Sequence, residues 1–163
     1  MRTNKFTHID DEGGARMVDI GDKPTTARRA VAEGRVRISA ALHEAIRGNA
    51  VAKGNLLDIA RLAGIQAAKR TDQLIPLCHS LPLDTVHVEA TLGECEIKLR
   101  AEARTSWKTG VEMEALTAVT VAALTVVDMG KAIDKAMVIE GVRIIEKSGG
   151  RSGDFSAEEP ADT

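Results

Sequence analysis

The longest stretch of this chain without a charged side chain limits its fold more than any other feature. Ala115–Val127 is a run of thirteen uncharged residues inside segment 111–133, which is rich in alanine, valine and threonine. Strands are rarely this long, so the length predicts a helix, and the near-absence of charge predicts burial on most sides. The run is too short to span a bilayer. We therefore expect a globular domain built around this helix.

The composition indicates how such a core is filled. Of the 163 residues, 44% are hydrophobic, 28% are charged and only 2% are aromatic, a balance that excludes collagen-like and wholly disordered chains. The aromatic residues are Phe6, Trp107 and Phe155, so aliphatic side chains must fill the interior. With so few aromatic residues, the chain can hardly bind nucleic-acid bases by stacking them on aromatic rings. A net charge of −2 does not favour binding to phosphate backbones. No nucleic-acid partner is expected.

The hydrophobic periodicity of the remaining chain predicts a single α+β domain. Alternating patterns predict strands at 25–39, 86–90, 97–101 and 137–145, and helical patterns predict helices at 40–47, 55–70 and 111–133. Segment 71–84, which contains Pro76 and Pro82, is expected to be an ordered loop, and Met17–Ile20 a short strand. This order is the β-α-β-β-α-β arrangement of ferredoxin-like α+β folds, in which two helices pack on one face of an antiparallel sheet.

The chain divides into three predicted parts. Residues 1–24 read as a partly mobile N-terminal arm, residues 25–147 as the catalytic α+β domain, and residues 148–163 as a Gly/Ser-rich loop with a disordered acidic end. The last segment, from Lys147 to Gly153, is expected to be irregular. Cys78 and Cys95 form neither a disulfide framework nor a CxxC motif, and the polar N-terminus is no signal peptide. A cytoplasmic protein without a membrane partner is expected, and its aliphatic surplus favours self-association.

Two candidate sites flank the first long predicted helix, one before it and one after it. Lys53 comes just before the helix N-terminus at Asn55, where backbone N–H groups favour an anion, although a solvated lysine before a capped helix is the favoured reading. Leu77, Cys78 and His79 lie between the two prolines of the 71–84 loop, where a histidine could act as an acid, a base or a ligand. A buried cysteine beside a hydrogen-bonded histidine is an equally good interpretation. Too few ligands are nearby for zinc, so no metal is expected.

Two further candidates mark the ends of the uncharged helix. Glu112 and Glu114 flank Met113 in its first turn and point to nearly opposite sides, so we expect different roles for them, although dipole compensation alone could explain both. Asp128 and Lys131 share one helix face and are the first charges after the uncharged run. That position predicts an acid–base pair at the rim of an apolar cavity. Lys147 and Arg151 could add an anion-binding loop, although Gly/Ser-rich tails are more often simply flexible.

These segments together resemble the cyclic pyranopterin monophosphate synthase (MoaC) family of molybdenum cofactor biosynthesis. The resemblance is carried by long, compositionally unusual motifs, such as LIPLCHSLPL and TGVEMEALTA, which follow one another along almost the whole chain. The matching segments are Thr7–Asp10, Met17–Ile20, Ala63–Thr71, Leu74–Leu83, Thr109–Ala118, Asp128–Ala132 and Lys147–Phe155.

The resemblance implies a fold, a reaction and a set of site residues. It implies a ferredoxin-like homohexamer, a trimer of dimers, with active sites at the dimer interface and no metal or organic cofactor. The implied substrate is a 3′,8-cyclised dihydro-GTP supplied by a radical-SAM enzyme, which is converted to cyclic pyranopterin monophosphate with release of pyrophosphate. The implied catalytic residues are Asp128, Lys131 and Lys53. The implied substrate contacts are Leu77, Cys78, His79, Met113 and Glu114, with Glu112 and Lys147 as further active-site positions.

The chain departs from the common family pattern without losing an acid, a base or a charge. Val127 replaces a tyrosine, Gly130 a cysteine and Arg151 a lysine. A competing interpretation is a non-catalytic ligand-sensing module on the same fold, which would need an anion site but no proton-transferring lysine. An RNA-binding ferredoxin-like domain is disfavoured by the missing aromatic residues. Release of pyrophosphate from the cyclised nucleotide would separate the enzyme from the sensing module.

Overall fold

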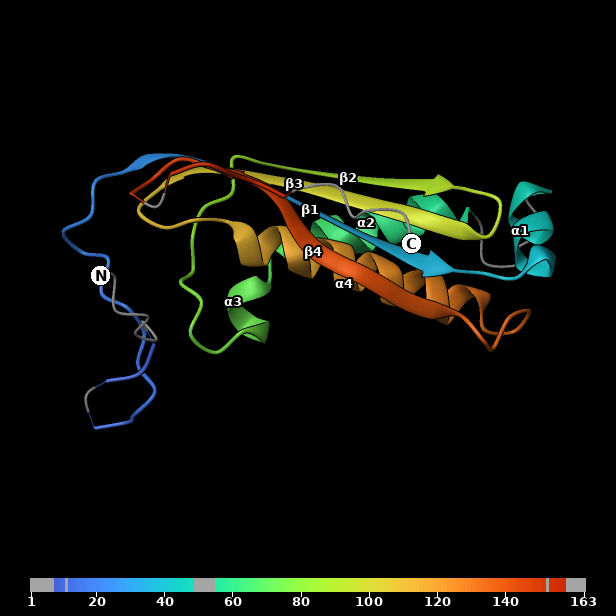
Figure 1. Ribbon diagram of the computed structural model, residues 1–163, viewed down its shortest axis with the longest axis horizontal. Helices are drawn as coiled ribbons and strands as arrows, with labels where there is room; N and C mark the ends of the chain where they lie inside the picture. Colours follow the sequence, from blue (N-terminus) through green and yellow to red (C-terminus); the bar gives the residue numbers. More distant parts are fainter. Residues whose placement is uncertain (1–7, 11, 49–54, 152, 158–163) are drawn as a thin grey trace.

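An open antiparallel sheet forms one layer of the protein (Figure 1). The computed structural model describes residues 8–10, 12–48, 55–151 and 153–157. The strand order is β2-β3-β1-β4-β5. The strands are β1 (Thr26–Arg37), β2 (Thr85–Leu92), β3 (Glu96–Trp107), β4 (Val138–Ser148) and β5 (Phe155–Ser156). The first four strands have the order and the antiparallel pairing of the ferredoxin-like fold, which confirms the predicted fold class.

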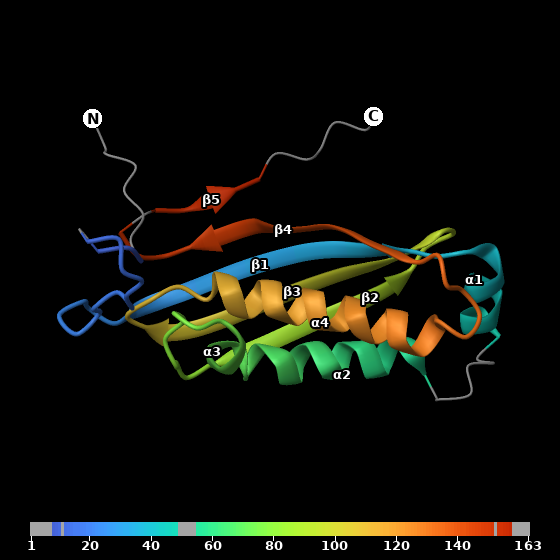
Figure 2. The same ribbon diagram turned by 90° about the horizontal axis from the view of Figure 1, so that it is seen from below.

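The helices form the second layer, on one face of the sheet (Figure 2). Helices α2 (Leu56–Ala68) and α4 (Glu112–Gly130) run side by side beneath the strands. The short helix α3 (Thr71–Leu74) lies at the same end of the molecule as the N-terminal arm and the start of α4, whereas α1 (Ala40–Arg47) lies at the opposite end, with the C-terminus of α4. Helix α4 therefore extends from one end of the domain to the other.

Most predicted elements are present, and the differences have local causes. Strand β3 continues to Trp107 because Ala103 and Thr105 keep the inward alternation beyond position 101. Strand β4 continues to Ser148, so the expectation of an irregular segment from Lys147 is wrong for its first two residues. Met17–Ile20 forms no strand, and Thr71–Leu74 is a helical turn rather than a loop. Helix α4 ends at Gly130, three residues before the predicted end.

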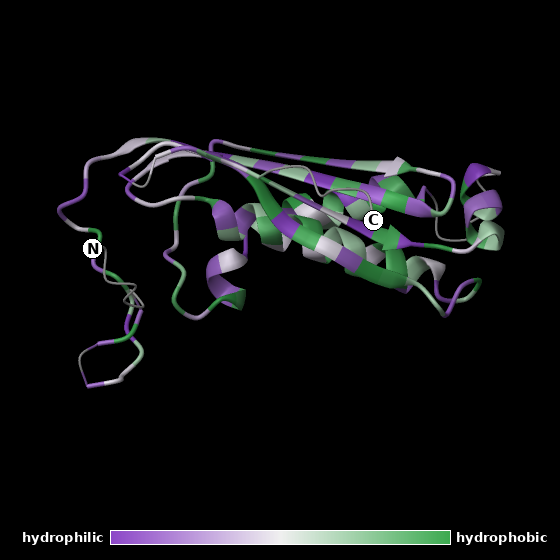
Figure 3. Cartoon of the chain, viewed as in Figure 1, coloured by the Kyte–Doolittle hydropathy of each residue, from purple (hydrophilic) through white to green (hydrophobic). Residues whose placement is uncertain are grey.

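Small side chains let the two long helices approach the sheet and each other closely. A Cβ added to Gly64 of α2 would lie 2.8 Å from the carbonyl oxygen of Ala118 in α4. On the sheet, a Cβ at Gly34 would lie 2.8 Å from a methyl group of Val119. The residues of α4 are mostly hydrophobic (Figure 3), and ten of them are buried. A core of alanine, valine and leucine is thus compact without aromatic side chains, because the elements themselves are close together.

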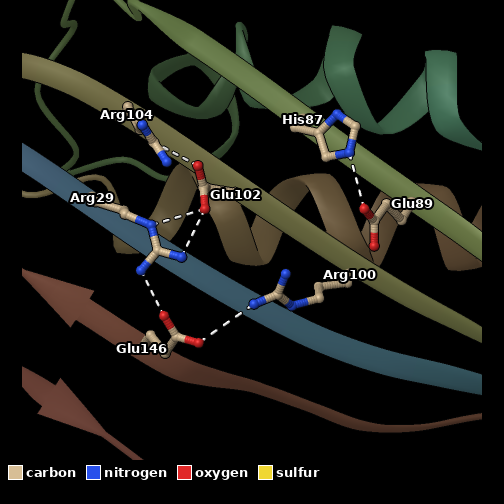
Figure 4. Close-up of polar contacts among 7 residues, drawn as sticks. All are labelled: Arg29, His87, Glu89, Arg100, Glu102, Arg104 and Glu146. Carbon is tan, nitrogen blue, oxygen red and sulfur yellow. Dashed lines mark hydrogen bonds and ion pairs between the residues drawn. The ribbon is translucent and has the colours of Figure 1, made fainter.

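The opposite face of the sheet is covered by alternating positive and negative side chains (Figure 4). Arg29 contacts Glu102 at 2.7 Å and Glu146 at 2.6 Å, and Arg100 and Arg104 extend the network on β3. The hydrogen bond from Arg29 lowers the pKa of Glu146, so its carboxylate stays charged at neutral pH. Val31 lies on this face of β1, between Arg29 and Glu33, yet is fully buried. The long stems of charged side chains can cover apolar residues in this way.

The close helix contact at Gly64 gives the first testable prediction. Gly64→Ala should destabilise the fold by about 1–3 kcal/mol, because the added methyl group collides with the Ala118 carbonyl. In a solvent-exposed helix the same change would stabilise by up to about 1 kcal/mol. The measurement is the urea midpoint at fixed protein concentration, with Gln66→Ala, an exposed position of the same helix, as the control. A higher midpoint for Gly64→Ala would contradict the proposed packing.

Candidate functional site

Most of the predicted site residues gather at the end of the domain where the N-terminal arm, α3 and the start of α4 meet (Figure 2). We call this group the arm-end cluster. It consists of Leu77, Cys78, His79, Glu112, Met113, Glu114 and Lys147. The loop that carries the first three is fixed by local contacts, because Cys78 N donates to Ile75 O at 3.0 Å and Thr105 Oγ1 donates to Pro82 O. The loop and α4 together hold the cluster.

Two members of the arm-end cluster, His79 and Glu114, line a polar cavity of about 190 Å³. The lining also contains five polar residues that were not predicted as site residues, namely Lys69, Thr71, Asp72, Gln73 and Ser80. Asp72 belongs to α3, the turn that was predicted as loop. The cavity thus combines an imidazole, two carboxyl groups and an ammonium group, and it can bind a polar ring that carries both donors and acceptors.

Glu114 is the most unusual group of the cavity. Its side chain is buried, with 4% of the residue exposed. Burial, with the nearby charges of Glu112 and Asp72, raises the pKa of Glu114 to about 7. The carboxyl group is therefore neither fully protonated nor fully ionised at neutral pH, which is the condition under which a carboxyl group best transfers a proton. Glu112, two residues earlier, is half-buried and pairs with Lys147 instead, so the two carboxyl groups have different surroundings, and their different roles stay a prediction.

Cys78 is unsuited to act as a nucleophile. Burial, followed by the negative charges of Glu114 and Asp72, raises the pKa of the Cys78 thiol. The thiolate is the reactive form, so a thiol held neutral at pH 7 is a weak nucleophile. Unlike its neighbour His79, Cys78 is not among the residues that line the cavity. Within the described residues, no three histidine, cysteine or acidic side chains come together as a metal site.

Positive charge borders the cluster on the side of β1 and β4. Lys147 Nζ lies 3.3 Å from Glu112 Oε1. Arg28 was not identified from the sequence; it donates to Gly149 O at 3.5 Å, and its side chain occupies the space that a Cβ at Gly150 would need. Gly149 and Gly150 both have positive φ, 91° and 84°, which favours glycine.

The sequence of β1 does indicate that Arg28 occupies an inward position. On β1 it has the same parity as Ala30, Ala32 and Val36, which are fully buried against the helices. A charged residue at an inward position of an otherwise regular alternation predicts a polar interior or a ligand.

Asp128 and Lys131 lie at the other end of α4. Their predicted pairing is confirmed, because Lys131 Nζ contacts Asp128 Oδ1 at 2.6 Å. The expected position at the rim of a dry cavity is not found in the single chain, where the two side chains are 63% and 59% exposed. Asp128 follows Glu114 by fourteen residues, so about 21 Å of helix separates the two groups. Lys53 lies outside the described residues.

A larger hollow of about 770 Å³ lies on the charged face of the sheet, lined among others by Arg35, Lys98 and Arg100. None of the predicted site residues lines it, and the sheet separates it from the arm-end cluster. The smaller cavity is the better candidate site, because the residues suited to proton transfer surround it.

The buried carboxyl group predicts a pH-dependent stability. Between about pH 4.5 and pH 7 the unfolded chain releases the Glu114 proton while the folded chain keeps it, so stability falls as the pH rises, by on the order of 3 kcal/mol for a shift of this size. Glu114→Gln should remove this fall. Urea unfolding in steps from pH 4.5 to pH 8 measures it, with the exposed Glu94→Gln as control. If the free energy of unfolding changed with pH to the same extent in the original chain and in Glu114→Gln, the raised pKa could not belong to Glu114.

Known proteins are similar to this chain over most of its length. The MoaC family pattern matches residues 17–150. A cyclic pyranopterin monophosphate synthase of Thermomicrobium roseum is 54% identical over 157 residues, which cover 95% of each chain. Synthases of the same name from Heliobacterium modesticaldum and Streptomyces griseus are each 53% identical, covering 94% and 96% of this chain and 98% and 89% of their own. The chain therefore belongs to the MoaC family and, like these relatives, is an enzyme of the lyase class.

Proposed function

We propose that this enzyme converts a 3′,8-cyclised 7,8-dihydro-GTP to cyclic pyranopterin monophosphate with release of pyrophosphate. The observation that supports this best is the cavity lined by Glu114, which combines a carboxyl group suited to proton transfer with His79 and Lys69. The substrate would come from a radical-SAM enzyme, the reaction would need no metal or organic cofactor, and the enzyme would act in the cytoplasm. Among the described residues, only α4 is long and apolar enough to cross a bilayer, and it is the core helix of the domain.

The residue types fit the steps that this conversion requires. Opening the five-membered ring and building the pterin ring move protons among nitrogen and oxygen atoms, which groups such as Glu114 and His79 can relay. Closing the cyclic phosphate forms one P–O bond to a hydroxyl oxygen and breaks the P–O bond to the pyrophosphate that leaves. Negative charge then builds on the leaving oxygens. Lys147, which pairs with Glu112, and Arg28, which donates to Gly149 O, are the cations that would stabilise it.

Lys131 is the proposed principal general acid, oriented by the Asp128 carboxylate. Lys53 would help to neutralise the triphosphate. In one chain, however, the Asp128–Lys131 pair is exposed and about 21 Å from Glu114 along the helix axis. The two groups cannot act on one small substrate within a single copy. A complete site therefore needs a second copy of the chain.

The outward face of α4 supports such a composite site. Met113 and Leu124 on this face are 36% and 53% exposed, and Leu116 and Val127 are only partly covered. Two α4 helices packed antiparallel about a two-fold axis near their middle would cover these side chains. The same symmetry would place Asp128 and Lys131 of one copy beside the arm-end cluster of its partner, twice per dimer. Three such dimers would form the proposed hexamer.

Loss of the proposed general acid is the first test. Lys131→Ala should lower kcat for pyrophosphate release by about 10²–10⁴-fold while the assembly stays folded, because a positioned acid contributes about that factor. Lys135→Ala, an exposed lysine four residues later, is the matched control and should be unaffected. Turnover is measured as pyrophosphate released from the cyclised nucleotide, with sedimentation to check the assembly. Normal turnover of Lys131→Ala would refute the role.

Mixing two inactive variants tests the composite site. Lys131→Ala and Lys147→Ala are unfolded together, refolded and assayed. If the two residues meet across a two-fold interface, half of the random dimers are mixed and each has one intact site, so about one quarter of the original activity should return. If one chain supplied both residues, every site would keep a lesion and activity would stay absent. Each variant refolded alone is the control.

Pyrophosphate release also separates the enzyme from a ligand-sensing module on the same fold. Tight binding of the cyclised nucleotide without release would favour the sensing module.

A further inference from the structure

The N-terminal arm contacts the candidate site directly. The described part of the arm begins with a bridge between Ile9 and Ala15 and then runs to the start of β1 along the end of the domain where α3 and the start of α4 lie (Figure 2). Two hydrogen bonds fasten it there. His79 Nε2 lies 2.7 Å from the Val18 carbonyl oxygen, and Lys108 Nζ donates to the Gly21 carbonyl at 2.5 Å. Val18 and Ile20 are half-buried, whereas Met17 and Asp22 are exposed.

The contact with Val18 fixes which nitrogen of His79 carries a proton. A carbonyl oxygen can only accept a hydrogen bond, so His79 Nε2 must donate one. In the neutral ring the other nitrogen, Nδ1, is then the acceptor. Which nitrogen accepts decides what an imidazole can do, because only that atom can take a proton or a hydrogen bond from a ligand.

Nothing else in the described chain holds the imidazole in this way. The bond to Val18 is the one hydrogen bond that the described residues offer to the ring. The loop that carries His79 is fixed through its backbone, by Cys78 N and by the Pro82 carbonyl, neither of which touches the imidazole. His79 lines the cavity together with Glu114, so its orientation affects the same site.

We propose that the N-terminal arm is a positioning element of the active site, in which the Val18 carbonyl holds His79 as the Nε2–H tautomer with Nδ1 as the acceptor for the substrate. The substrate group that donates a hydrogen bond to His79 Nδ1 is an N–H or O–H group of its ring system. This proposal rests on the proposed function only in assigning the cavity to the substrate. Val18 acts through His79 and has no chemistry of its own.

The arm can be loosened without touching the cavity. Val18→Gly with Ile20→Gly removes the two half-buried side chains that seat the arm, and Met17→Gly with Asp22→Gly places the same number of glycines at exposed positions of the same arm. Both double variants are made in the full chain. Nitrogen-15 spectra of labelled histidine report the tautomer of His79 without any substrate, and His79→Gln identifies its signals.

The original chain and the Met17/Asp22 control should show the Nε2–H tautomer of His79. The Val18/Ile20 variant should show a mixture of tautomers and lose about tenfold or more in kcat/KM, while the domain stays folded. An Nε2–H signal that persists in the Val18/Ile20 variant, or an Nδ1–H tautomer in the original chain, would overturn the proposal. The spectra need no turnover, so an enzyme without pyrophosphate release but with these tautomers would refute the proposed function and leave the role of the arm intact.

Discussion

The structure depends on the close approach of small residues where α2, α4 and the sheet meet. At Gly64 there is no room for a methyl group before the Ala118 carbonyl, and at Gly34 none before Val119. Because the elements are this close, alanine and valine fill the interior at normal density and no aromatic side chain is needed. The same closeness buries α4 along most of its length. Every property of the site follows from the position of that helix.

Helix α4 carries residues of the proposed site at both of its ends. Its first turn brings Glu114 into a polar cavity, where burial keeps the proton on the carboxyl group up to about neutral pH. Its last turn presents Asp128 and Lys131 to solvent, far from that cavity. A rigid helix cannot bend to join its own ends, so the proposed site, which uses both groups, requires a second copy of the chain. The uncharged run makes α4 a core helix and also separates the charged groups at its two ends. A symmetric assembly is therefore the expected form of the proposed enzyme.

The sequence predicted the fold well where one face of an element is apolar and the other polar. Helix α1 has the predicted bounds, and Asn55 caps α2 by accepting from Leu57 N and Asp58 N. Predictions failed where the pattern is weak or where tertiary contacts decide. Thr71–Leu74 is too short for a helical period, and Met17–Ile20 finds no neighbouring strand with which to pair. The inward position of Arg28 follows only when the alternation of β1 is extended from Val36 back through Ala32 and Ala30.

The sequence alone determined the two layers, the order of the elements and the chemical types at the site, because periodicity and capping are local properties of the chain. It also contained the motifs by which the family is identified. Only the tertiary structure decided that Glu114 is buried beside Asp72, that Lys147 pairs with Glu112, and that the arm reaches His79. These contacts join residues from different elements, most of them far apart in the chain, and burial, which sets the pKa of a carboxyl group, exists only once those elements have packed.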